Sequence, residues 1–316
     1  NICVSESLYN IRMWSDDWSP SHFMDMIDQL RGCHIRVLGA EEMELMGFDQ
    51  KKDIKRISRA LKRSSNKCTF VSGGWPQSEI NWPAYSKVEY WPTFWLSHTV
   101  KSCKQANFDV TNDNFEYPFI TLNHRPWEHR CRMMDNLAKA GLLSVGAYSW
   151  NKTEPDYNFR HWKQKRVVLD NFNDKLDHFN NMPKEYSKSF IELVNESSID
   201  NIFITEKTAK PIFYKKVFLI HGARGIHKAL EGLGFKLYDE IFDYSFDNEW
   251  YAKTRASKIV KQLEDNVGAP KKALELYKSV QDKVEFNFNR LIEISKDKEF
   301  IPDTIKELGG YENVIS

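Results

Sequence analysis

Residues 190–222, FIELVNESSIDNIFITEKTAKPIFYKKVFLIHG, decide the fold. The stretch begins with an apolar run, 190–195, which ends at the acid Glu196, and it closes with a second apolar run, 217–221, which ends at a glycine. Between the two runs we expect a helix over 205–214. A strand, a helix and a strand in this order predict two parallel strands of one sheet, with Glu196 at the carboxyl end of the first strand.

The start of the expected helix carries an adjacent acid and base, Glu206 and Lys207. Such a pair suits a nucleotide, because the carboxylate accepts from ribose hydroxyls while the ammonium and the helix N-terminus face phosphate. Without further evidence, such a pair is ordinarily just two solvent-exposed residues in the first turn of a helix. The surrounding pattern therefore has to decide between the two interpretations.

That pattern of strand, acid, Thr-Glu-Lys, helix, strand and glycine turn resembles the donor-binding segment of the α-1,3-fucosyltransferase family. The motif Thr-Glu-Lys-Thr-x-Lys-Pro-Ile is also similar to phage-encoded sequences of the glycosyltransferase type. The resemblance implies a GDP-fucose-like donor bound by Thr205, Glu206 and Lys207, with Glu196 ordering the donor loop or facing the sugar. The family has Tyr where this chain has Phe203, a change that is compatible with stacking or packing of the ring but removes a hydroxyl contact to the nucleotide. The base and the sugar of the donor therefore stay open.

The resemblance covers about residues 118–250, and its second part lies upstream of the first. A strand over 118–123 is followed by a helix over 127–140, whose apolar residues recur at helical spacing up to a terminating glycine. In the family, an Arg in the first turn of this helix contacts the donor diphosphate. The resemblance implies this role for Arg130, with Arg125 as a second candidate.

The glycine turn after the second apolar run supplies another candidate, Gly222, which lies between His221 and His227. A histidine in such a turn is ordinarily a loop residue with satisfied hydrogen bonds. The functional interpretation is a contact of the donor sugar or phosphate with Gly222, where the absence of a side chain allows a close approach.

Strands and helices alternate in both halves of the chain, which predicts parallel sheets. We expect an α/β protein with two Rossmann-like domains facing a cleft, the GT-B architecture: an acceptor-side domain over 1–112, and a nucleotide-sugar-binding domain with a helical tail over 113–316. In the first half, strands are expected at 2–5, 34–39 and 68–74, with helices that begin near residue 19 and include residues 54–61. In the second half, strands are expected at 118–123, 142–147, 189–195, 217–221 and 235–238, with helices at 127–140, 205–214, 226–231 and 269–294.

Composition is compatible with this architecture and sets few limits on partners. The chain has 316 residues, of which 41% are hydrophobic, and its formal net charge is +1, which indicates neither a polyanionic nor a polycationic partner. No apolar run has the length of a membrane span, and the first residues lack a signal-peptide layout. The five cysteines are an odd number without a closely spaced pair, which indicates free thiols in a reducing compartment. We therefore expect a cytoplasmic protein.

The sequence contains no Asp-x-Asp motif, the usual holder of a divalent ion in glycosyltransferases. We expect no metal and no cofactor, and we expect Arg130, Lys207 and helix N-termini to stabilise the departing diphosphate. The resemblance implies an inverting displacement. It also places a general base just after the glycine that ends the third strand, where this chain has Gly74 and Trp75. Glu79 is the nearest acid and our candidate base, with Glu41, Glu42 and Asp17 as rivals.

The acceptor is left open between a glycan and a hydroxymethylated DNA base. A helix near residues 51–67 is dense in Lys and Arg, which is typical of a solvated helix face but also suits nucleic-acid phosphates. Aromatic residues downstream can stack on a sugar or an extruded base, or fill the core: Trp75, Trp82, Tyr85, Tyr90, Trp91, Phe94 and Trp95. The alternative function is a non-catalytic nucleotide- or nucleic-acid-binding protein on the same scaffold, which needs phosphate contacts but no base.

Overall fold

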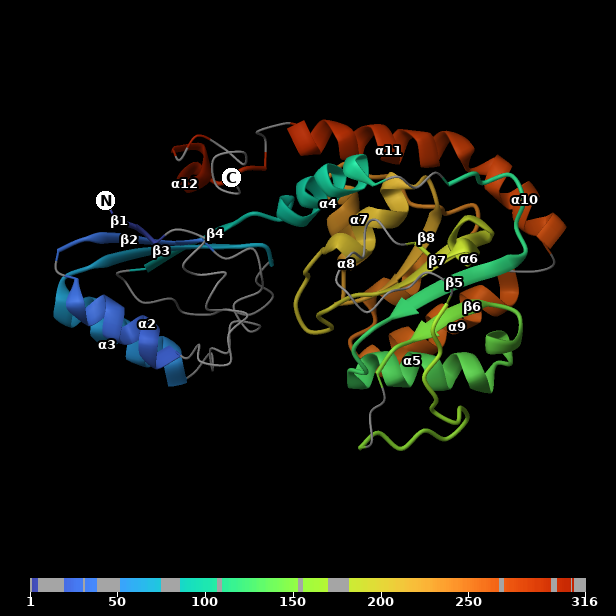
Figure 1. Ribbon diagram of the computed structural model, residues 1–316, viewed down its shortest axis with the longest axis horizontal. Coiled ribbons are helices and arrows are strands. Elements are labelled where there is room, and N and C mark those ends of the chain that lie inside the picture. The colour runs from blue at the N-terminus through green and yellow to red at the C-terminus, as the bar shows by residue number, and fades with distance from the viewer. Residues whose placement is uncertain are drawn as a thin grey trace. The chain divides into compact units, whose positions relative to one another are not determined.

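The computed structural model divides the chain into two compact units, 1–95 with 296–316, and 96–295. Each unit contains one four-stranded parallel sheet (Figure 1). This division differs from the expected boundary at 112 and 113, because most of helix α4 (Phe94–Gln105) belongs to the second unit and the C-terminal segment belongs to the first. The residues that the structure describes are 2–4, 20–30, 32–38, 52–74, 86–106, 110–152, 156–169, 182–266, 270–296, 300–307 and 309.

The first unit pairs its strands in chain order, and every pair is parallel. The predicted alternation of strands and helices is confirmed for its described residues, and a fourth strand, β4, was not predicted. The elements are β1 (Ile2–Val4), α2 (Pro20–Gln29), β2 (His34–Leu38), α3 (Lys52–Ser64), β3 (Lys67–Ser72), β4 (Ser86–Tyr90) and α12 (Asp303–Glu307).

Helices α2 and α3 pack on the sheet of this unit through fully buried apolar side chains. Ile27 of α2, Leu61 of α3 and Phe70 of β3 are each 0% exposed. The C-terminal segment joins the unit through Ile305, which packs with Val71 and Trp91 in a second cluster. These contacts explain why the end of the chain belongs to its first domain.

A single buried amide connects the ends of three elements in the first unit. Asn66 is 0% exposed; its Oδ1 accepts from the backbone N–H of Cys33 at 2.9 Å, and its Nδ2 donates to the carbonyls of Ile27 at 3.0 Å and Leu30 at 3.1 Å. The side chain thereby donates to two carbonyl groups at the end of α2, where the regular hydrogen bonds of the helix stop.

Asn66→Ala is expected to destabilise the protein by about 1–3 kcal/mol, because it removes the three hydrogen bonds that this buried amide makes to the backbone. Urea unfolding of this variant beside Gln29→Ala, an exposed substitution on α2, measures the difference. Equal midpoints for the two variants would contradict the role of the amide.

The second unit has the strand order β6-β5-β7-β8, again with every pair parallel. All residues of β7 and β8 are buried, because helices cover both faces of the sheet. In Figure 1, α5 and α9 lie on one face and α7 on the other. The bounds are β5 (Tyr117–Asn123), α5 (Glu128–Lys139), β6 (Ala147–Trp150), β7 (Ser189–Asn195), α7 (Glu206–Phe213), β8 (Val217–His221) and α9 (Ala252–Asn266).

The strand order places a topological switch point between β5 and β7. After β5 the chain moves outward to β6, and after β7 it moves outward in the opposite direction to β8. In open parallel sheets, ligands bind at the carboxyl ends of the two strands where the direction reverses. The segments that follow Asn123 and Asn195 therefore meet at the position where a ligand site is expected.

Three predicted elements of the second unit are wrong in detail. The strand expected at 142–147 begins only at Ala147, because Gly141 turns the chain with φ of +73° and a short 3-10 helix, η2 (Leu142–Ser144), follows. The expected helix over 269–294 is two helices, α10 (Pro270–Ser279) and α11 (Gln281–Lys296).

The segment 235–238 is the third correction, because it is not part of the sheet. The amide of Asn287 takes the place of a neighbouring strand: its Oδ1 accepts from Lys236 N at 2.7 Å, and its Nδ2 donates to Lys236 O at 2.9 Å. The pattern of buried Phe235 and Leu237 is real, but a helix side chain satisfies the backbone between them.

Three shorter elements complete the described part of the second unit. They are α6 (Lys184–Ser187), α8 (Ile226–Gly232) and the 3-10 helix η3 (Tyr244–Asn248). In the part of the chain that the structure describes, no helix is both long and apolar enough to cross a bilayer.

Candidate donor-binding site

The site is organised around the carboxylate of Glu196, the first residue after β7. Glu196 is 0% exposed, and its carboxylate accepts four hydrogen bonds. Oε1 accepts from Thr205 N at 3.0 Å and from Thr208 Oγ1 at 2.6 Å; Oε2 accepts from Thr205 Oγ1 at 2.7 Å and from Ser197 N at 3.1 Å. A buried carboxylate is costly without such partners, and these partners fix the loop between β7 and α7.

The same contacts place a negative charge at the N-terminus of α7. Thr205 is the N-cap residue, with φ of −113° and ψ of −174°, and its Oγ1 also accepts from Lys207 N at 3.3 Å. A carboxylate at this position is favoured by the helix dipole. We expected the N-terminus of α7 to face phosphate; in the structure the Glu196 carboxylate occupies it. Of the two roles expected for Glu196, this geometry favours ordering the loop.

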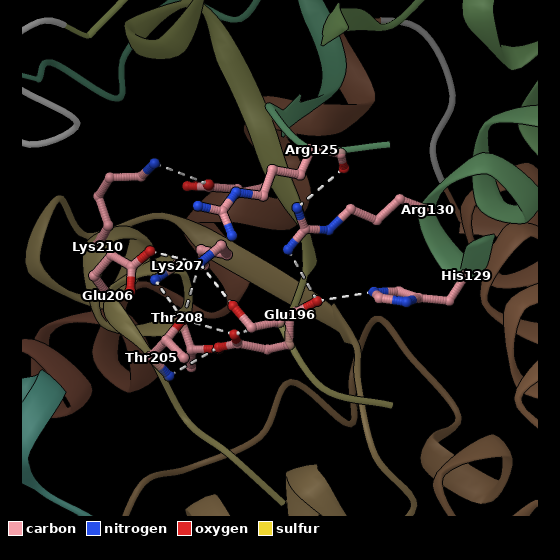
Figure 2. Close-up of polar contacts among 11 residues, drawn as sticks. Arg125, His129, Arg130, Glu196, Thr205, Glu206, Lys207, Thr208 and Lys210 are labelled. Atoms are coloured by element: carbon pink, nitrogen blue, oxygen red, sulfur yellow. Dashed lines mark hydrogen bonds and ion pairs between the residues drawn. The ribbon is translucent and has the colours of Figure 1, made fainter. Parts of the chain in front are cut away.

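The backbone carbonyl of Glu196 connects β7 to helix α5, which follows β5. His129 Nε2 lies 2.9 Å from this oxygen and Arg130 Nη2 lies 3.2 Å from it (Figure 2). Burial and the neighbouring Arg130 charge lower the pKa of His129 to about 4, so the ring is neutral at pH 7. Because the carbonyl can only accept, the neutral ring carries its proton on Nε2 and donates it.

Arg130 is 4% exposed, yet its guanidinium is only partly satisfied. Nη1 donates to Arg125 O at 3.3 Å, Nη2 donates to Glu196 O, and Nε has no hydrogen-bond partner among the described residues. Within that part of the chain, no carboxylate forms an ion pair with it. Burial lowers the pKa of Arg130, and the charges of Glu196 and Glu206 oppose that shift. Arg130 is therefore a buried positive charge whose N–H donors are not all used within the described residues.

Lys207 lies on the same side of Glu196 as this guanidinium (Figure 2). Its Nζ donates to Glu206 Oε1 at 2.5 Å, to Ser197 Oγ at 3.1 Å and to Thr205 Oγ1 at 3.4 Å. The Lys207 side chain is 28% exposed and that of Glu206 is 18% exposed, so a ligand can reach both. The predicted acid–base pair is therefore a partly exposed ion pair at the start of α7.

Arg125 adds an exposed cation to the cluster. Its carbonyl fixes Arg130, its charge contributes to the lowered pKa of Arg130, and Figure 2 shows its side chain extending toward the region of Lys207. Lys210, one turn after Lys207, lies 3.6 Å from the carboxylate of buried Glu192. The structure thus brings together the predicted residues Arg125, Arg130, Glu196, Thr205, Glu206 and Lys207.

Two other predicted residues are held by packing. Phe203 is 2% exposed and belongs to the core. A Cβ at Gly222 would lie 2.8 Å from Ile226 Cδ1 and 3.4 Å from Glu196 Cβ, so close packing alone accounts for this glycine. Neither observation shows a ligand contact.

The two histidines near Gly222 have structural partners. His221 Nδ1 lies 3.1 Å from Asn195 Oδ1, across the ends of β8 and β7. His227 Nε2 accepts from Ile220 N at 3.2 Å, so its Nδ1–H donates to Asp247 at 2.9 Å. The bonds of His227 agree with the ordinary interpretation of a satisfied histidine. His221 fits it only in part, because its buried Nε2 has no hydrogen-bond partner among the described residues.

The candidate bases lie outside the described residues: Glu79 and its rivals Glu41, Glu42 and Asp17. Among the described residues, no group of three or more His, Cys, Asp or Glu side chains could hold a metal ion. The sequence reasoning missed His129, Ser197 and Thr208. Thr208 follows the N-cap Thr205 by three residues, which is a capping spacing that could have indicated it. His129 depends on the meeting of β5 and β7, which no local signal shows.

Comparison with protein families finds no matching family model, and comparison with curated proteins finds no match. Among solved structures, the chain is similar to the crystal structure of the DNA-modifying enzyme β-glucosyltransferase in the presence and absence of its substrate uridine diphosphoglucose. The TM-score is 0.39 at 12% identity, over 87% of this chain and 77% of that chain. A likeness of this size supports no inference about function.

Glu196→Gln is expected to destabilise the protein by about 1.5–3 kcal/mol at pH 7, because an amide offers one acceptor where four donors converge. Urea unfolding beside Glu264→Gln, an exposed acid on α9, measures the effect with the same change in charge. Unfolding midpoints that agree between the two variants would show that the Glu196 carboxylate does not hold the loop.

Proposed function

We propose that the protein is a glycosyltransferase that moves a sugar from a nucleoside-diphosphate sugar to a hydroxyl acceptor, and that its second unit binds the donor. The observation that carries the proposal is Arg130: a buried guanidinium at the switch point of a parallel sheet, with an unpartnered Nε and no ion-paired carboxylate among the described residues. Glu196 and Glu206 act on this charge only without an ion pair, and a buried charge that lacks a direct partner is costly unless an anion completes it. A diphosphate is an anion whose oxygens can accept from the N–H groups of the guanidinium.

The chemistry of sugar transfer needs a cation at this place. The acceptor oxygen forms a bond to the anomeric carbon of the sugar, the bond to the diphosphate oxygen breaks, and the electron pair leaves with the nucleoside diphosphate. Arg130 and Lys207 stabilise the charge that builds on the leaving oxygens, and they act strongly because the site is largely buried. The proton of the acceptor hydroxyl passes to a general base, for which Glu79 is the candidate. We propose an inverting, metal-independent displacement.

The ion pair of Glu206 and Lys207 supports binding of a nucleotide over binding of a bare anion. When a phosphate takes over the ammonium, the Glu206 carboxylate becomes available to accept from ribose hydroxyls. In the proposed GT-B arrangement, the first unit presents the acceptor and the base. A non-catalytic nucleotide-binding protein would share these phosphate contacts but would transfer no sugar.

Two exposed aromatic residues near the site offer a face for the base of the nucleotide. Trp250 is 73% exposed and Tyr251 is 71% exposed, and the Arg224 guanidinium lies 5.1 Å from the centre of the Trp250 ring. Their backbone is fixed: buried Arg255 donates to the carbonyls of Trp250 at 3.2 Å and Gly222 at 3.0 Å. Since Gly222 packs against Glu196, this loop lies beside the donor site. We propose that the base stacks here.

Lys207→Ala is expected to abolish the stabilisation that nucleotides give and to lower transfer by about 10²–10³-fold, because it removes a cation from the diphosphate. A thermal-shift panel of GDP, UDP, ADP, CMP and dTDP, with and without magnesium, measures binding; a ligand at about 100 times its Kd adds about 2.7 kcal/mol of stability. Lys188→Ala is the control, since Lys188 also pairs with a Glu at 2.6 Å.

The expected result is a shift by one diphosphate in wild type and in Lys188→Ala, independent of magnesium and lost in Lys207→Ala. If no diphosphate stabilises the wild type, the donor site is refuted. If nucleotide binds but the sugar nucleotide is neither transferred nor hydrolysed with any hydroxyl acceptor, the non-catalytic alternative replaces the enzyme.

Trp250→Ala is expected to weaken binding of the nucleoside diphosphate by about 5- to 150-fold, the equivalent of ~1–3 kcal/mol of stacking, while leaving pyrophosphate affinity unchanged. Phe286→Ala is the matched control, because Phe286 is also exposed and also lies against a cation, Lys236 Nζ at 4.0 Å. Isothermal titration with both ligands separates the base from the phosphates. Equal losses for both ligands, or no loss, would place the base elsewhere.

A further inference from the structure

The first unit carries a strong concentration of positive charge, and the residues proposed to bind the donor belong to the second unit. Residues 51–67 contain eight of the 45 Lys and Arg residues and one of the 44 acids, Asp53. The segment therefore carries a formal charge of +7 in a chain whose total is +1, and the rest of the chain sums to −6. A mixed solvated surface does not concentrate one sign of charge in this way.

Helix α3 presents this charge on one rigid face. Its apolar side is fixed in the core, where Ile57 is 1% exposed, Ala60 is 2% exposed and Leu61 is 0% exposed. On its opposite side, all the exposed residues that the structure describes are cations: Lys55, Arg56, Arg59, Lys62 and Arg63. The helix cannot turn its apolar side outward without dismantling the core of the unit.

Three of these cations have no ion pair within the part of the chain that the structure describes. Arg63 pairs with Asp28 of α2, whereas Lys55, Arg59 and Lys62 pair with no described acid. The three follow an i, i+4, i+7 spacing, so they form one stripe of about 10 Å along the helix. One DNA strand carries a phosphate about every 3.4 Å of its axis, so the stripe matches about three phosphates.

The composition of the face decides among polyanionic partners. An interfacial helix that binds an anionic membrane needs exposed apolar side chains to enter the lipid boundary, and the exposed described residues of α3 include none. A small anion would require converging donors, whereas these side chains follow a line. A linear polyanion fits the line of charge.

We propose that the exposed face of α3 binds the phosphate backbone of duplex DNA without reading its sequence. The assignment of DNA as the carrier of the acceptor hydroxyl rests on the proposed glycosyltransferase function. The binding itself does not, since the stripe lies in the other unit from Arg130 and Lys207. If the acceptor is a glycan or a hydroxymethylated DNA base, a DNA-binding surface favours the DNA base.

The test is fluorescence anisotropy with a labelled 30-base-pair duplex in 25–200 mM KCl, without nucleotide, on the full chain. The triple variant Lys55→Gln, Arg59→Gln, Lys62→Gln is compared with Lys253→Gln, Lys258→Gln, Lys261→Gln, three exposed lysines of α9 with the same change in charge. Neutralising three phosphate contacts reduces the slope of log K against log[KCl] by about 2.7. We expect that reduction, with a loss of affinity of about 10-fold or more at 50 mM KCl, only in the α3 variant.

Absence of duplex binding by the wild type at 25 mM KCl would overturn the proposal, and so would equal losses in both triple variants. Co-sedimentation with phosphatidylserine vesicles that depends on the three α3 residues, without DNA binding, would assign the face to a membrane instead. The nucleotide thermal shift is measured on the same proteins. If it persists in the α3 variant, the chain is folded, and a failure of DNA binding is separate from a failure of the donor site.

Discussion

The structure of the second unit depends on one buried carboxylate, that of Glu196. It accepts four hydrogen bonds from the loop after β7 and from the start of α7, and the carbonyl of the same residue binds His129 and Arg130 of α5. Both sides of the candidate site therefore depend on one residue. Because the carboxylate also occupies the N-terminus of α7, the helix dipole stabilises the internal charge, and the cation for a ligand has to come from side chains.

Arg130 is a cationic side chain that keeps an N–H group without a hydrogen-bond partner among the described residues. Its guanidinium is buried against carbonyl groups, which satisfy two of its N–H groups but supply no counter-charge. Burial raises the energy of such a group, and it also strengthens any electrostatic contact that a ligand makes with it. Donors that are already fixed need little reorganisation when charge develops, which is the condition for transition-state stabilisation. In the proposed function, the cost of burying this guanidinium is offset when the diphosphate binds.

Local patterns predicted those parts of the fold whose signals are local, namely the apolar runs of β7 and β8 and the alternation of strands and helices. The grouping of Arg130, Thr205, Glu206 and Lys207 was implied by the resemblance to the fucosyltransferase family. Elements that depend on distant partners did not. The segment 235–238 has a strand pattern, but the amide of Asn287, some fifty residues later, satisfies its backbone. His129 likewise acquires its role only because β5 lies beside β7 in the sheet.

The near-zero net charge conceals two kinds of positive site that work by different physics. Arg130 is buried and insulated from salt, so in the proposed function one guanidinium contacts the diphosphate and acts on its departure. The stripe on α3 is exposed and screened, so each cation contributes little, and the proposed DNA binding needs several contacts that release counterions together. A transferase with a polymeric acceptor needs both kinds: a directional contact where bonds change, and a tolerant one that holds the polymer at any sequence. The net charge of the chain reveals neither site, because acidic residues elsewhere in the sequence balance the number of cations without lying next to them.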